Sequence, residues 1–174
     1  MSGRRALFGG AFVVLLSMLG LLAADRVHAR ETSLLLATDL SADVAAAASA
    51  GMPLLVLYSL PGCPHCESLR QQHLRALSVE SPARALVRQV DLGGAHHLID
   101  FAGRKNTHAG FARAQEIKFA PVVVIYGAAG ARLVPPLVGV MLADFYSAYL
   151  DDALATASAA IKATPIGSAR TKSI

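Results

Sequence analysis

Apolar residues gather in short runs along the chain, and the lengths of these runs predict the strands of a sheet. The clearest run, Leu54–Leu60, is apolar almost throughout, which is typical of a strand buried on both faces. Pro135 and Pro136 cannot donate hydrogen bonds to a neighbouring strand, so the segment that holds them is expected at an edge of the sheet. The predicted strands are Leu34–Leu36, Leu54–Leu60, Ala85–Leu92, Pro121–Tyr126 and Arg132–Val138.

Helical periodicity and capping residues predict four helices among these strands. Ser41 and Thr107 stand where an N-terminal cap is expected. In the last helix the apolar residues recur at the i, i+3, i+4, i+7 spacing, and we expect Tyr146 and Tyr149 of this stripe in the core. The predicted helices are Ala42–Ala50, Glu67–Leu77, His108–Lys118 and Leu142–Ala163. Strands and helices that alternate early, with a hairpin late, predict an α/β fold with a central mixed sheet and helices on both faces.

The amino terminus has the order of a secretory signal. Arg4 and Arg5 precede the largely apolar segment Ala6–Ala24, and Val27-His28-Ala29 places small or apolar residues where a signal peptidase reads. This order predicts a signal peptide at 1–29 that is cleaved after Ala29, one domain at 30–163 and a flexible tail at 164–174, in the periplasm. The apolar segment is also close to the roughly 20 residues that span a bilayer, so an uncleaved membrane anchor is the alternative.

The charge balance gives no indication of nucleic-acid binding. The whole chain has a formal net charge of +4, and residues 1–29 hold three arginines and one aspartate, so the remainder has a net charge of +2. The basic residues form no stripe, and we expect no nucleic-acid partner. After cleavage of the signal we expect no association with the membrane either.

The four residues Cys63-Pro64-His65-Cys66 contain the two cysteines of the chain. A C-x-x-C sequence between a predicted strand and a predicted helix is typical of a thiol–disulfide redox site. The start of a helix favours the thiolate of Cys63, and a thiolate is the attacking species in disulfide exchange. We therefore predict that Cys63 is the nucleophile and that Cys66 resolves a mixed disulfide, while Pro64 and His65 tune the pair. Export would place the thiols where disulfides persist.

Two other functions stay open at this point. A metal-binding or metal-delivery module could use both thiolates with a histidine, because soft thiolates suit Cu(I) or zinc. The histidines at 73, 96, 97 and 108 show no ligand spacing relative to Cys63, so we predict no metal site, and we expect no cofactor. The other alternative is a non-catalytic chaperone or interaction domain that keeps the fold without the chemistry.

Three segments of the chain together resemble the thioredoxin superfamily. They are the apolar run Leu54–Leu60, the motif that ends at Cys66, and the stretch Phe119–Gly127, in which Pro121 precedes an apolar strand. The resemblance covers nearly all of the chain after residue 33. It implies a thioredoxin-like fold and thiol–disulfide oxidoreductase activity. It also implies a cis peptide bond before Pro121, where the Ala120 backbone would lie near Cys63 and bind an extended substrate.

Within the superfamily the chain looks similar to the small secreted thioredoxins of bacteria, including the SoxW-like group. Its C-P-H-C sequence resembles that of the DsbA-type oxidants. The resemblance implies protein thiols or disulfides as substrates and a redox partner in the membrane. The motif favours an oxidant and the small fold favours a reductant, so the direction of electron flow stays open.

Two positions depart from the pattern of the superfamily. Gly62 stands where many thioredoxins have a tryptophan, and the chain contains no tryptophan. Leu57 stands where the family often buries a carboxylate that moves protons while a mixed disulfide is resolved. Proton transfer would then depend on water, His65 or another group.

Overall fold

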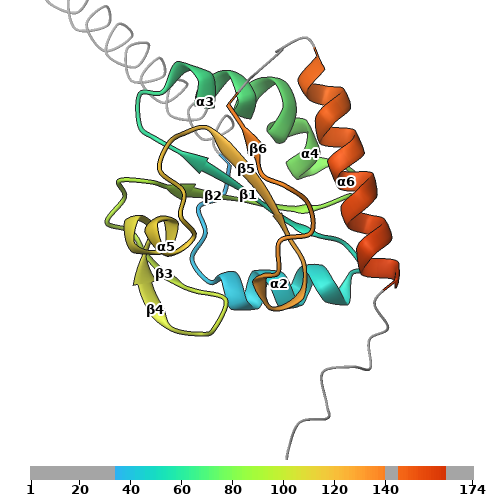
Figure 1. The fold of residues 1–174 in the computed structure, drawn as a ribbon, viewed down its shortest axis with the longest axis horizontal. Coiled ribbons are helices and arrows are strands. Elements are labelled where there is room, and N and C mark those ends of the chain that lie inside the picture. The colour runs from blue at the N-terminus through green and yellow to red at the C-terminus, as the bar shows by residue number, and fades with distance from the viewer. Residues whose placement is uncertain (1–33, 140–144, 164–174) are drawn as a thin grey trace, which may run out of the picture. The chain divides into compact units, whose positions relative to one another are not determined.

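The computed structural model describes residues 34–139 and 145–163, which form a mixed four-stranded sheet in the order β2-β1-β5-β6 (Figure 1). Strands β1 and β2 are parallel, whereas β5 runs antiparallel to β1 and β6 antiparallel to β5. A separate two-stranded sheet is formed by β3 and β4. The strands are β1 Leu54–Ser59, β2 Leu86–Asp91, β3 His97–Ile99, β4 Lys105–Thr107, β5 Val122–Tyr126 and β6 Leu137–Val138.

Helices cover both faces of the four-stranded sheet, as the pattern of the sequence predicts (Figure 1). One face packs against α3, η1, α4 and α6, and the other packs against α2 and α5. The helices are α2 Leu40–Ser49, α3 Pro64–Leu69, the π-helix η1 Arg70–Leu74, α4 Arg75–Val79, α5 His108–Ala114, the short 3-10 turn η2 Ala128–Gly130 and α6 Tyr146–Ala163. The predicted α/β fold with a central mixed sheet is confirmed.

Strand β1 lies at the centre of the sheet, and every one of its residues is buried. Its continuous apolar sequence fits this position, because both of its faces lie under helices. The register pairs Leu57 with Gln89 on β2 and with Val123 on β5. At its carboxyl end β1 changes from apolar residues to Ser59, the last residue before the loop that leads to Cys63. The cysteine motif therefore lies at the end of the sheet where β1 has its carboxyl end.

On the face of the sheet under α2 and α5, the hydroxyls of two buried tyrosines form a hydrogen bond with each other. The hydroxyl oxygens of Tyr58 and Tyr126 lie 2.7 Å apart, and the Tyr126 hydroxyl also donates to Oε1 of Gln115 at 3.3 Å. Burial, reinforced by the neighbouring Tyr126, raises the pKa of Tyr58 far above the usual range of tyrosine. The pair therefore stays neutral, and each hydroxyl satisfies the other inside an apolar core.

Several predicted boundaries are wrong, and local hydrogen bonds explain them. Asp39, not Ser41, caps α2, because its carboxylate accepts from the backbone N–H of Ala42 at 2.9 Å. Ser41 instead donates its hydroxyl proton to the same carboxylate at 2.7 Å. The predicted first strand at 34–36 is reduced to an isolated bridge between Leu36 and Gln89.

Two predicted helices differ from those observed. The helix after the motif begins at Pro64 rather than Glu67, and it contains a wide π turn at Arg70–Leu74 that periodicity does not indicate. The helix capped by Thr107 ends at Ala114 instead of Lys118.

The last helix, α6, buries Tyr146 as predicted, but Tyr149 is 52% exposed and does not belong to the core. The helix begins at Tyr146, and the earlier part of the predicted segment, at 142–144, lies outside the described residues. So do the predicted signal peptide and the tail at 164–174. Among residues 34–139 and 145–163, none of the helices is both long enough and apolar enough to cross a membrane.

Candidate active site

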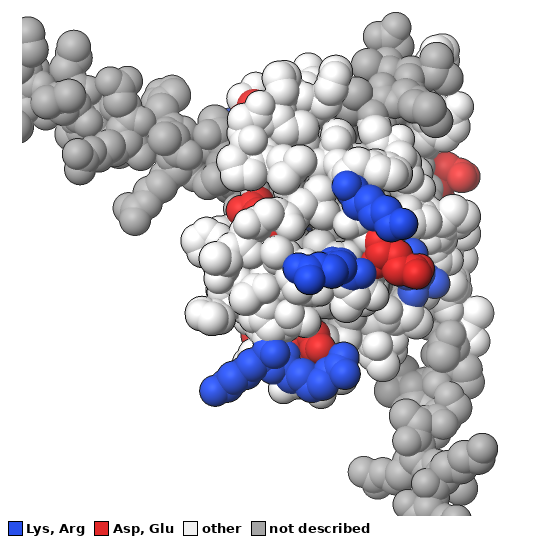
Figure 2. Space-filling view, turned by 60° about the vertical axis from the view of Figure 1, so that its left-hand side comes forward, with Lys and Arg blue, Asp and Glu red and all other residues white. Residues whose placement is uncertain are grey.

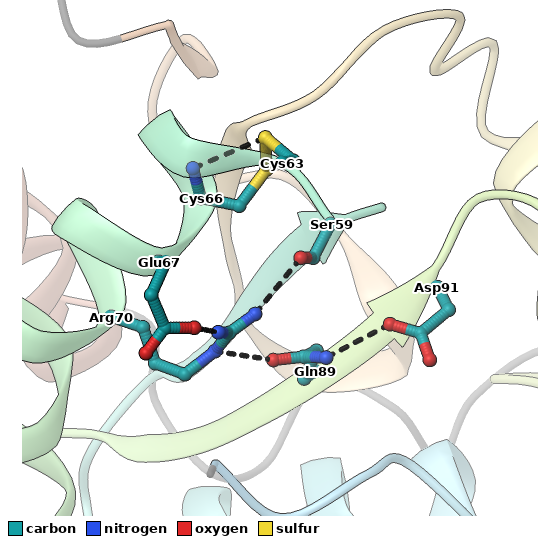
Figure 3. The surroundings of a disulfide bond; sticks show 7 residues. All are labelled: Ser59, Cys63, Cys66, Glu67, Arg70, Gln89 and Asp91. Carbon is teal, nitrogen blue, oxygen red and sulfur yellow. Dashed lines mark hydrogen bonds and ion pairs between the residues drawn. A yellow bond between two sulfur atoms is a disulfide. The ribbon is translucent and has the colours of Figure 1, made fainter. Parts of the chain in front are cut away.

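The two cysteines form a disulfide at the start of α3 (Figure 3). Cys63 is the N-cap residue of this helix, and its sulfur accepts from the backbone N–H of Cys66 at 3.1 Å. Pro64 occupies the first turn, where its missing N–H costs no helical hydrogen bond. Cys66 is fully buried, whereas Cys63 is partly exposed. The helix start therefore leaves Cys63 partly accessible to solvent and encloses Cys66.

The loop that leads from β1 to the disulfide is exposed at Leu60, Pro61 and Gly62. Gly62 has a backbone φ of +69°, and nothing lies within 4 Å of the position that a Cβ would take. Such a positive φ is rarely adopted by residues with a side chain. The backbone conformation thus explains why residue 62 is a glycine, and a tryptophan at this position would be strained. Pro64 and His65, the predicted tuning residues, are both exposed.

The predicted substrate-binding segment lies at the same end of the sheet. The Ala120–Pro121 peptide bond is cis, as the resemblance implies. Val122, the first residue of β5, pairs with Tyr58 near the carboxyl end of β1. The two strands are antiparallel, so β5 begins at the end of the sheet where β1 finishes. The cysteine motif follows β1 at this same end. Just before the cis bond, Phe119 is 57% exposed.

A hollow of about 420 Å³ opens beside Cys63. Its polar lining comes from two strands and one helix. Arg70 lies at the centre of this lining, and Figure 3 shows its guanidinium pointing toward the ends of β1 and β2. The residues that line the hollow are Ser59, Leu60, Pro61, Gly62, Cys63, Pro64, Glu67, Arg70, Gln89 and Asp91.

Hydrogen bonds join the charged residues of this hollow into one network. Arg70 donates from Nε to Oε1 of Gln89 at 3.0 Å and from Nη2 to Oγ of Ser59 at 3.1 Å. Its Nη1 donates to Oε2 of Glu67, with which it forms an ion pair. Gln89 in turn donates from Nε2 to Oδ1 of Asp91 at 2.8 Å. The network ties the helix that carries Cys66 to the ends of both parallel strands.

A buried histidine supports the end of β2 from the other face. The ring of His108 is fully buried; its Nδ1 accepts from the backbone N–H of Asp91 at 3.0 Å, and its Nε2 lies 2.8 Å from the carbonyl oxygen of Ala37. Nε2 must then carry the proton and donate to Ala37. His108 is therefore a structural residue, which agrees with the absence of a ligand spacing in the sequence.

Leu57 lies in the apolar core under α3 and α6, where it is fully buried. Its partner in register on β2 is Gln89, whose side chain belongs to the polar network. Ser59 lies two residues after Leu57 on the same face of β1, and its partner in register on β2 is Asp91. These two residues thus place polar groups near the disulfide. In the described part of the chain, no group of three or more His, Cys, Asp or Glu residues is arranged to hold a metal ion.

Most of this network was not predicted from the sequence. Its signal is present, however, in two places. Gln89 and Asp91 are polar at alternate positions of an otherwise largely apolar strand, and residues spaced by two lie on one face. Arg70 follows Cys66 by four residues, which places it one helical turn along the same side. What the sequence lacks is the strand register that brings these positions together.

The family described as thioredoxin-like domain matches residues 40–154. The search of curated proteins gives no match.

Several solved structures are similar to this chain. A thioredoxin from Thermus thermophilus is 19% identical with a TM-score of 0.51, over 74% of this chain and 93% of that one. Mitochondrial thioredoxin 3 from Saccharomyces cerevisiae is 17% identical with a TM-score of 0.46, over 70% of this chain and 97% of that one. The periplasmic thioredoxin SoxS from Paracoccus pantotrophus is 17% identical with a TM-score of 0.42, over 60% and 98%. At 19% identity, the similarity to the Thermus thermophilus thioredoxin concerns the fold alone.

Proposed function

Because the chain belongs to the thioredoxin-like domain family, we propose that it is a thiol–disulfide oxidoreductase that exchanges disulfides with protein substrates. The observation that carries this proposal is the disulfide between Cys63 and Cys66 at the start of a helix, with Cys63 partly exposed and Cys66 buried. A disulfide that closes so short a loop constrains the unfolded chain little. Its placement suits chemistry better than stabilisation.

In the proposed reaction Cys63 is the nucleophile. Its thiolate attacks one sulfur of a substrate disulfide, which forms a mixed disulfide and releases the first substrate thiolate. The sulfur of Cys66, as its thiolate, then attacks the Cys63 sulfur, releases the second substrate thiolate and closes the protein disulfide. The substrate gains two electrons and two protons, and the protein loses them. The reverse sequence oxidises a substrate dithiol.

We place the substrate between the disulfide and the cis peptide bond. Ala120 and Pro121 stand at the end of the sheet to which β1 delivers the motif. The exposed side chains of Leu60, after β1, and Phe119, before β5, add apolar surface at this end. A substrate in extended conformation could pair with the Ala120 backbone while its sulfur meets Cys63. Pro64 and His65, exposed between the two cysteines, keep their proposed tuning role.

The cellular setting is also part of the proposal. The signal-like segment at 1–29 supports a periplasmic location, where the substrates would be protein thiols or disulfides and a membrane protein would renew the redox state. The layout of the whole chain supports the finer placement near the SoxW-like secreted thioredoxins, whereas the C-P-H-C sequence resembles that of the DsbA-type oxidants.

The test of the reaction uses two single substitutions. Cys63→Ser is expected to abolish disulfide exchange with a dithiol peptide. Cys66→Ser, mixed with a peptide that contains a disulfide, is expected to attack one sulfur of that disulfide, release the other as a thiolate and accumulate a mixed disulfide at Cys63, visible as an added mass that dithiothreitol removes. A variant Cys63→Ser with undiminished turnover would refute the assignment of the nucleophile.

The direction of electron flow is tested by equilibrating the protein with glutathione. A midpoint potential below about −250 mV, near the thioredoxin end of the scale, would exclude the oxidant role. A midpoint near the DsbA end, about −120 mV, would exclude the reductant role.

A further inference from the structure

Arg70 is a largely buried cation held close to the disulfide by three separate contacts. Its side chain is 13% exposed, and its guanidinium donates to Ser59 on β1, to Gln89 on β2 and to Glu67 on its own helical segment. Two of these contacts do not involve Glu67. Arg70 should therefore keep its place when the charge of Glu67 is removed.

The charges that line the hollow beside Cys63 are few and can be assigned one by one. Arg70 is the cation of this lining, and Glu67 and Asp91 are its anions. Glu67 forms an ion pair with Arg70. Asp91 accepts a hydrogen bond from Gln89 and, within the described residues, forms no ion pair. The three charges lie in a partly enclosed space, where salt screens them less than it would on an open surface.

We propose that Arg70 and Glu67, acting with opposite sign through their charges, set the redox equilibrium of the Cys63–Cys66 pair. Arg70 is the positioning residue of the network, and neither residue takes part in the exchange itself. The inference rests on the proposed function of the pair as a redox centre. Its physical basis is that an oxidised pair is neutral, whereas a reduced pair carries a thiolate. A nearby cation stabilises the thiolate and an anion destabilises it.

The redox equilibrium of the pair is measured by disulfide exchange with glutathione. Two glutathione thiols reduce the protein disulfide, so that one S–S bond breaks in the protein and one forms in glutathione disulfide. Two electrons pass to the protein, and two protons accompany them unless one thiol ionises. Stabilising the thiolate therefore moves the equilibrium toward the reduced protein. Because the chain has no tryptophan, the reduced fraction is best measured by alkylating the free thiols and resolving the products by mass.

The experiment compares the two halves of one ion pair. At pH 8, Glu67→Gln is expected to raise the equilibrium constant for reduction, and Arg70→Met to lower it. Each change is expected to be on the order of three- to tenfold, the effect of half to one pKa unit. A purely structural role of the ion pair predicts the same direction for both variants, because both break the same contact.

Further variants keep the test decisive if Arg70→Met does not fold. Asp91→Asn removes the other anion and must shift the equilibrium in the same direction as Glu67→Gln. Arg70→Lys keeps the charge but loses the fork that reaches both strands, so its equilibrium should stay within about twofold of the wild type while its stability falls. Arg84→Met is the matched control, because Arg84 pairs with Glu80 and Asp151 and does not line the hollow.

The proposal is overturned if Glu67→Gln and Arg70→Met shift the equilibrium in the same direction. It is also overturned if Glu67→Gln and Asp91→Asn both leave the equilibrium within twofold of the wild type. These failures are distinct from failure of the proposed function, since they leave the loss of exchange in Cys63→Ser untouched.

Discussion

The helices α2 and α3 begin with the same hydrogen bond made by two different side chains. In α2 the Asp39 carboxylate accepts from the backbone N–H three residues on, at 2.9 Å. In α3 the Cys63 sulfur accepts from the N–H of Cys66, also three residues on, at 3.1 Å. A carboxylate is a strong acceptor, whereas a disulfide sulfur is a weak one. The strength of the Asp39 cap is therefore independent of the redox state, whereas that of the Cys63 cap depends on it.

This difference shows what a cysteine gains from the N-cap position. When Cys63 is reduced to the thiolate, its sulfur carries a charge at the positive end of the helix, as Asp39 does at all neutral pH values. The helix start then favours the reduced form. Helix α5 begins with a neutral cap, because the hydroxyl of its N-cap residue Thr107 accepts from the backbone N–H of Gly110 at 3.1 Å. Substitutions at the starts of α2, α3 and α5 distinguish residues that stabilise the fold from the one that takes part in disulfide exchange.

The largest effect on stability is expected at the start of α5, where His108 is the first helical residue. His108→Ala leaves the N–H of Asp91 and the carbonyl of Ala37 without partners in the core. The expected loss is about 3 kcal/mol in the free energy of unfolding, measured by urea denaturation followed by circular dichroism. His97, which is exposed, provides the control, and His97→Ala should cost less than about 0.5 kcal/mol. Equal effects of the two would contradict the structural role of His108.

A smaller, pH-dependent effect is expected at the start of α2. Hydrogen bonds from the Ala42 N–H and the Ser41 hydroxyl lower the pKa of Asp39 below its usual value. A carboxylate with a lowered pKa contributes stability above its unfolded pKa, about 3.9, and loses it as the pH falls through the folded value. Asp39→Ala should therefore cost about 1 kcal/mol at pH 7 and progressively less below about pH 4.

Two variants control the pH dependence at α2. Asp39→Asn keeps a capping oxygen without a charge and should stay close to the wild type at pH 7. Thr107→Ala removes a neutral cap and should cost the same at pH 7 as at pH 3.5. If the cost of Asp39→Ala does not change between these pH values, the carboxylate is not the source of the stabilisation.

The smallest effect on stability is expected at α3. Compared with the wild type under reducing conditions, Cys63→Ser should change the free energy of unfolding by less than about 0.5 kcal/mol, because serine is itself a favourable N-cap. The same variant should lose disulfide exchange altogether. A stability loss above about 1 kcal/mol in urea denaturation would mean that the α3 start serves the fold as much as the chemistry.

The sequence allowed the fold to be predicted, because the fold depends on local patterns. The apolar run of β1, the C-x-x-C spacing and Pro121 each occupy a few neighbouring residues, and the strand, the disulfide and the cis bond follow them. The choice of cap was wrong at Ser41 because both Asp39 and Ser41 are good capping residues. Only the backbone conformation at residue 39, which is extended, decides between them.

The polar network beside the disulfide could not be predicted, because it depends on contacts between distant segments. Arg70 meets Ser59 and Gln89 only when the parallel register of β1 and β2 is known. Periodicity also gave no sign of the π turn that begins at Arg70. The charges drawn in Figure 2, with basic side chains beside acidic ones over a largely uncharged face, likewise follow from the fold rather than from any charged run.

The segment that precedes α2 has a consequence for how copies of this chain behave at high concentration. Strand β2 is an edge of the sheet, but the N–H of Gln89 donates to Leu35 at 2.9 Å and its carbonyl accepts from Ala37 at 2.8 Å. The other edge, β6, has two residues and follows Pro135 and Pro136. Long unpaired edges are templates on which chains add as new strands and aggregate. Here one edge is occupied and the other is short, so both disfavour growth of the sheet from one molecule into the next.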